Sequence, residues 1–81
     1  MKLKPKPIYI EWFDPTSVDE WREFAEIQKM EVHKITTLGY LIKENASSCF
    51  VSLNVDIERE GSSCSMIIPK SSITKRKWVK L

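Results

Sequence analysis

The densest group of side chains able to bind a ligand lies at residues 69–72, between two strand-like runs. There Lys70, Ser71 and Ser72 follow a proline and offer a cation, two hydroxyls and the free amides of a turn. Such a set binds phosphate or carboxylate through charge-assisted hydrogen bonds. The alternative is a plain corner between strands. We therefore treat the three residues as a candidate anion site.

Aromatic residues supply the second half of the candidate site. Arg76 and Trp78 share one face if residues 73–80 form a strand, and a cation beside an aromatic ring can stack a base and neutralise its phosphate. The alternative places Trp78 in the core, with the neighbouring cations protecting a sheet edge. Trp12 and Tyr40 are either lid aromatics of a barrel or further members of a ligand pocket.

No set of residues indicates catalysis. His33 is the only histidine, no nucleophile stands near it in sequence, and the chain has only two glycines and no phosphate-binding loop. Cys49 and Cys64 lack the paired spacing of a zinc site and are expected to be small core residues. The sequence therefore predicts a non-enzymatic protein without a metal or other cofactor.

Charge is segregated along the chain although its net value is only +2. Residues 11–31 carry seven acidic side chains against two basic ones, whereas residues 65–81 contain five basic side chains and no acidic one. This pattern suits self-association, a positive surface for an anionic ligand, or simple solubility. This charge pattern, together with three Trp, three Phe and two Tyr in 81 residues, leads us to expect a homo-oligomer.

The N-terminal third predicts an arm, a strand and a helix. Residues 1–7 alternate Lys and Pro and should form a flexible basic arm, followed by one domain over residues 8–81 that opens on the β-branched and aromatic run 8–13. Ser17 and Glu20 have the spacing of a capping box, and apolar residues recur at helical intervals behind them. We expect a single helix over about residues 18–30.

The remaining sequence has the two-residue period of strands joined by short turns. Residues 32–44 are apolar on both faces, and Gly39 within them indicates a bend or a close backbone approach. Residues 49–56 alternate with Cys49, Val51 and Leu53 inward. Residues 64–68 continue to a corner at Pro69. The order predicts a mainly β fold with one N-terminal helix, arranged as a small five-stranded barrel.

Residues 36–81 resemble an Sm-like barrel. "TTLGYLIKENASSCFVSLNVD" is similar to its first half, with a glycine inside the first strand, and "SMIIPKSSITKRKWV" is similar to its second half. The resemblance implies an Sm/SH3-like fold. The turn that contacts RNA in bacterial Sm-like proteins is Lys-His or Arg-Gly, whereas residues 69–72 read Pro-Lys-Ser-Ser.

Nearly the whole chain resembles a group of small phage-encoded proteins. The shared motifs are Trp-x-Asp, then Ser/Thr-x-Gly-aromatic-Leu, then Ile-Pro-Lys, carried here by Trp12 and Asp14, by Thr37, Gly39, Tyr40 and Leu41, and by Ile68, Pro69 and Lys70. The resemblance implies a phage or prophage origin and a small all-β fold. It implies no activity.

These observations leave two main functional hypotheses. The first is a phage binding protein that sequesters an anionic ligand, such as a cyclic nucleotide signal or a short nucleic acid, to counter host defence. The second is an adaptor that binds a host protein through the acidic helix or a sheet edge; a virion or assembly accessory is a further alternative. With no apolar run long enough for a signal peptide or a membrane span, we expect a cytoplasmic protein.

Overall fold

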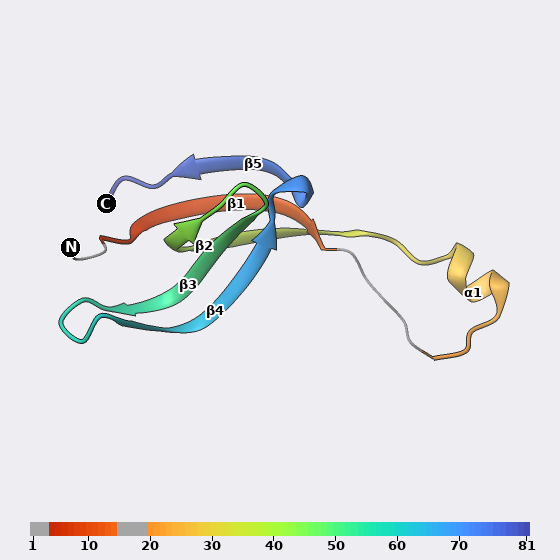
Figure 1. Ribbon diagram of the computed structural model, residues 1–81. Coiled ribbons are helices and arrows are strands. Elements are labelled where there is room, and N and C mark those ends of the chain that lie inside the picture. The colour runs from red at the N-terminus through yellow and green to blue at the C-terminus, as the bar shows by residue number, and fades with distance from the viewer. Residues whose placement is uncertain (1–3, 15–19) are drawn as a thin grey trace.

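The fold is a single antiparallel β-sheet with a projecting segment at one end (Figure 1). The computed structural model describes residues 4–14 and 20–81. The elements, in chain order, are β1 (Lys6–Asp14), α1 (Phe24–Gln28), β2 (His33–Glu44), β3 (Ser48–Asp56), β4 (Gly61–Pro69), the 3-10 turn η1 (Lys70–Ser72) and β5 (Ile73–Trp78). The mainly β prediction is confirmed. The sheet also begins at Lys6, within the segment predicted to be a flexible arm.

The predicted closed barrel is wrong, because the sheet is open. Its strand order is β4-β3-β2-β1-β5, and no ladder joins β4 to β5 among the described residues. The β3–β4 hairpin keeps one register from the Ser48–Pro69 pair to the Asp56–Gly61 pair. The hairpin lacks the register shift that often marks a barrel corner. In Figure 1 the turn end of the hairpin lies apart from β5.

The core lies on one face of the sheet, with β1 at its centre. Ile8, Ile10 and Trp12 alternate inward from β1. The other fully or nearly buried apolar residues are Cys49, Val51 and Ile68. The indole Nε1 of Trp12 donates a hydrogen bond of 3.0 Å to Thr37 Oγ1, so the buried polar atom of the ring is satisfied. This core is small for a chain of 81 residues.

Gly39 provides the close approach expected from the sequence. A Cβ at this position would lie 2.8 Å from the backbone oxygen of Ser52 and 2.9 Å from Val51 Cγ1. No glycine has a positive φ, so the requirement at Gly39 is for space and not for an unusual backbone conformation. The strands β2 and β3 pack closely here because one residue lacks a side chain.

The corner at Pro69 is confirmed. Pro69 ends β4 with φ −63° and ψ 131°, and η1 follows directly before β5. The backbone amide of Lys70 donates to the carbonyl of Ser47 at 2.8 Å, which ties the corner to the β2–β3 turn. That turn is closed by Asn45, whose Oδ1 accepts hydrogen bonds from the amides of Ser47 and Ser48.

The predicted helix over residues 18–30 is wrong in extent. Of the described residues 20–30, only Phe24–Gln28 are helical, none of the five is buried, and the N-cap Glu23 makes no side-chain capping bond. The expected Ser17–Glu20 capping box includes residue 17, which lies outside the described residues. A short helix depends on packing of its apolar face, and here that face is exposed.

Two inward positions predicted for β3 and β4 are also wrong. Leu53 is 53% exposed, whereas Ser52, predicted to face outward, is buried and its hydroxyl lies 2.6 Å from that of Ser65. Cys49 lies in the core as expected, but Cys64 is exposed and has a φ of 56°, and both thiols are free. The edge position of β4 leaves most of its residues without a covering layer.

Candidate functional site

Two of the predicted ligand-binding residues, Lys70 and Arg76, are already engaged by a carboxylate of the same chain. Glu44 Oε1 lies 2.8 Å from Lys70 Nζ, and its two oxygens accept hydrogen bonds of 3.1 Å each from the Arg76 guanidinium. All three side chains are about one-third exposed. The arrangement corrects the expectation that the cations of this region lack a compensating acid.

A bulge in β2 brings Glu44 to this position. Leu41 pairs with Val51, but Lys43 pairs with Phe50 and Glu44 with Cys49, so Ile42 is an extra residue in the ladder. An extra residue reverses which side chains face inward beyond it. Glu44 therefore shares the face of Cys49. Arg76 reaches the same face, its Nη1 lying 3.7 Å from Cys49 Sγ.

These contacts lower the pKa of Glu44. Hydrogen bonds from Arg76, and next from Lys70, lower the pKa of the Glu44 carboxyl from its ordinary value of 4.5 to about 2. The same pairing raises the pKa of Arg76. The group is ionised at neutral pH, so an anionic ligand at Lys70 would have to displace Glu44.

The other predicted site residues are divided between the core and the surface. Trp12 is buried in the core, and Tyr40 is half-buried on β2. Ser71 is exposed and Ser72 half-buried on η1. Trp78 is 51% exposed, and Arg76 and Lys6 lie over its ring, with Arg76 Cζ at 5.5 Å and Lys6 Nζ at 5.8 Å from the ring centre. The sequence prediction thus placed Arg76 and Trp78 together correctly.

A second group of cations lines an open groove of about 510 Å³ along β5. We call this the β5 groove; its residues are Tyr9, Lys75, Lys77, Trp78, Val79 and Lys80. Within the described residues, none of its three lysines has an ion-pair partner within 4.0 Å. The groove is therefore a positive surface that also exposes two aromatic rings.

Tyr9 is held in the groove by its neighbours on the sheet. Its hydroxyl donates to Glu11 Oε2 at 2.7 Å, and Glu11 Oε1 lies 2.8 Å from Lys34 Nζ. The bonds from Lys34 and then Tyr9 lower the pKa of Glu11, while the bond to Glu11 raises the pKa of Tyr9. Glu11 is thus neutralised chiefly by Lys34, although it faces Lys75 across the ladder.

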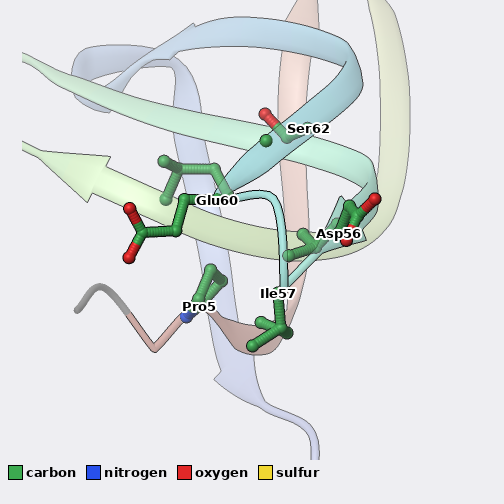
Figure 2. A pocket seen from close by; sticks show the side chains of 8 residues that line it. Pro5, Asp56, Ile57, Glu60 and Ser62 are labelled. Atoms are coloured by element: carbon green, nitrogen blue, oxygen red, sulfur yellow. The ribbon is translucent and has the colours of Figure 1, made fainter.

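A smaller cavity of about 220 Å³ lies beside the β3–β4 turn (Figure 2). It is lined by apolar side chains from Pro5, Ile42 and Ile57 and by the acids Asp56 and Glu60. Figure 2 shows that the two carboxylates point away from one another. The two carboxylates therefore do not converge on one position from which they could orient a ligand.

The most exposed aromatic residues lie on the segment that carries α1. We call residues 20–32 the α1 segment; every residue in it is exposed. Trp21 is 101% and Phe24 87% exposed, and the other large apolar side chains on this segment are Ile27, Met30 and Val32. The sequence predicted Trp21 and Phe24 to lie on the packed face of a helix. One feature of the sequence could have indicated this exposure: it predicts no second helix that could cover that face.

The described residues contain neither a cluster of metal ligands nor a membrane-spanning helix. Across residues 4–14 and 20–81, no three His, Cys, Asp or Glu side chains gather as metal ligands would. In the same residues no helix has the length and apolar character needed to cross a bilayer.

Comparison with known proteins adds no relative. No protein-family model matches the sequence, and searches among curated proteins and solved structures find no match. The likeness to Sm-like and small phage proteins thus stays a prediction carried by the short motifs described above.

Proposed function

We propose that this chain is a protein-binding module whose docking element is the α1 segment. The observation that carries the proposal is the exposure of Trp21 and Phe24, with two further apolar side chains at three-residue intervals, Ile27 and Met30. Burying one such aromatic ring is worth about 2–3 kcal/mol. A monomer that leaves several adjacent large apolar side chains in water has an interaction surface to offer.

The charges of the α1 segment agree with this role. Glu20 and Glu26 lie 3.3 and 3.6 Å from the Arg22 guanidinium, whereas Glu23 and Glu31 have no ion pair within the described residues. Apolar anchors flanked by carboxylates are typical of short elements that dock on a basic, apolar surface. The proposal is non-catalytic and favours the adaptor hypothesis among those raised by the sequence.

Site-specific photo-crosslinking tests the proposal. Phe24 is replaced by p-benzoylphenylalanine, which keeps an aromatic ring there, and the protein is irradiated in the cells that produce it. We expect a protein adduct that is resolved from the 9.5 kDa chain. The matched control carries the same replacement at Ile57, which is 57% exposed at the β3–β4 turn. No adduct from position 24, or equal adducts from both positions, contradicts the proposal.

The β5 groove supports a second candidate function, the binding of an anionic ligand such as a nucleotide or short nucleic acid. The groove is lined by three lysines, by Tyr9 and by the half-exposed Trp78, a combination that can hold phosphates and stack a base. A phage origin and a role against host defence remain predictions of the sequence resemblance.

Calorimetric titration with cyclic dinucleotides and short oligonucleotides tests this candidate. A charge-assisted contact is worth about 1.5–3 kcal/mol, so Lys77→Ala should weaken binding about ten- to a hundredfold. Lys70→Ala is the matched control, because Lys70 is occupied by Glu44. Absence of heat with every ligand argues against this function.

A further inference from the structure

The α1 segment and the β5 groove have complementary chemistry. The segment presents aromatic rings beside Glu23 and Glu31, and the groove presents two aromatic rings among three lysines. Contacts between acidic and basic side chains are favourable. Contacts of an aromatic ring with a lysine or with another aromatic ring are favourable too. The charges of the two surfaces are therefore complementary, and both surfaces carry aromatic rings.

Within one molecule the two surfaces lie at opposite ends. Figure 1 shows α1 beyond one end of the sheet, while β5 runs toward the other end, where the chain terminates. The described residues extend over 52 Å along the longest axis. A segment in this position cannot occupy the groove of its own chain, so the occupant must come from another molecule.

We propose that the partner of the α1 segment is a second copy of this chain, which receives the segment in its β5 groove. This inference rests on the proposed function and names its partner. Reciprocal exchange, in which each copy inserts its segment into the other, uses both surfaces on both copies and closes as a two-fold dimer. It also buries the apolar side chains that the small core of a single chain leaves exposed.

Sedimentation equilibrium tests the proposal directly. At about 100 µM, where mass action favours association, the parent should have twice the mass of the 9.5 kDa chain. Raising the salt concentration should weaken the dimer because part of the attraction is between charges. A parent that stays monomeric under these conditions overturns the proposal.

Variants of the two surfaces locate the contact. Trp21→Ala and Lys77→Glu should each weaken dimerisation at least about tenfold. The matched control for the charge reversal is Arg59→Glu, since Arg59 is 88% exposed on the turn after β3, and it should leave dimerisation unchanged. If Lys77→Glu dimerises as well as Arg59→Glu does, the β5 groove is not the receiving surface.

Mixing two charge-reversed variants gives a stricter test. Glu23→Lys and Lys77→Glu should each dimerise poorly alone. Together they should form a heterodimer, because the unaltered segment of one meets the unaltered groove of the other, while the two reversed surfaces again carry opposite charges. Far-ultraviolet circular dichroism establishes that both variants are folded. A mixture that dimerises no more tightly than either variant alone contradicts reciprocal docking.

The crosslinked adduct from position 24 separates this inference from the proposed function. An adduct of twice the chain mass supports both. An adduct of another mass, with a heterologous protein or a nucleic acid, overturns the inference; the protein adduct leaves the proposed function standing. No adduct overturns both.

Discussion

Trp12 and Trp21 belong to neighbouring parts of the chain and lie in opposite surroundings. Trp12 is 8% exposed and donates a hydrogen bond to Thr37 within the core, whereas Trp21 is fully exposed on the α1 segment. Burial of Trp12 therefore stabilises the sheet, whereas the exposed ring of Trp21 adds no packing to the single chain. One small domain thus separates aromatic residues that stabilise its fold from aromatic residues that do not.

The largest effect on stability should come from filling the space at Gly39. Gly39→Val places carbon where the Ser52 backbone oxygen is 2.8 Å away, and the strands must separate, so the free energy of unfolding should fall by about 1–3 kcal/mol. Gly61→Val is the control, because nothing lies within 4 Å of a Cβ there. Urea denaturation of both variants measures the difference. Equal midpoints would show that the β2–β3 contact is looser than described.

The same substitution should have different effects on stability at the two tryptophans. Trp12→Phe removes the bond to Thr37 Oγ1 and leaves space in the core, which should cost about 1–2 kcal/mol. Trp21→Phe should change the free energy of unfolding by less than about 0.5 kcal/mol. A comparable loss from both would mean that the α1 segment packs against the sheet.

The sheet and the α1 segment also differ in how far the sequence predicted them. The β-branched and aromatic run 8–13 predicted β1, and Gly39 and Pro69 predicted the close approach and the corner, because each depends on local backbone geometry. The helical periodicity around Trp21 predicted a packed face. Periodicity shows which side chains share a face, but not whether another element covers it.

The candidate site was predicted only in part for a similar reason. Arg76 and Trp78 share a face because of simple strand alternation. The pairing of Lys70 and Arg76 with Glu44 depends on the extra residue Ile42 in the β2–β3 ladder, and a bulge has no reliable sequence signal among apolar residues. Charge counted over residues 65–81 therefore overstated the free positive charge at the corner.

Glu44 should contribute a smaller, pH-dependent part of the stability of the sheet. Glu44→Gln removes a partly exposed double ion pair, and we expect a loss of about 1 kcal/mol at neutral pH. A carboxyl whose pKa is lowered on folding stabilises the folded state above its unfolded pKa. The contribution of Glu44 should thus be complete above its ordinary pKa of 4.5 and decline as the pH falls toward about 2.

Thermal unfolding from pH 7 to pH 2 measures this contribution as the difference between the parent and Glu44→Gln. The difference should narrow on acidification. A difference that stays constant over this range would mean that the carboxylate is not held by Lys70 and Arg76 in solution.

The smallest effect on stability should come from the α1 segment. Combining Trp21→Ala with Phe24→Ala should leave the free energy of unfolding of the dilute protein within about 0.5 kcal/mol of the parent, because neither side chain is covered in the single chain. Chemical denaturation at low protein concentration measures it. A loss of more than about 1 kcal/mol would assign these residues to the fold and remove the reason for proposing them as a docking element.

Hydroxyl-radical footprinting of the tryptophans at two protein concentrations distinguishes a docked α1 segment from an exposed one. In dilute protein, Trp21 should react rapidly and Trp12 slowly, in keeping with exposures of 101% and 8%. At the concentration where sedimentation shows dimers, Trp21 and Trp78 should both become protected while Trp12 is unchanged. A Trp21 that is protected in the dilute monomer, or that stays fully reactive in the dimer, would contradict docking of the α1 segment on a second copy.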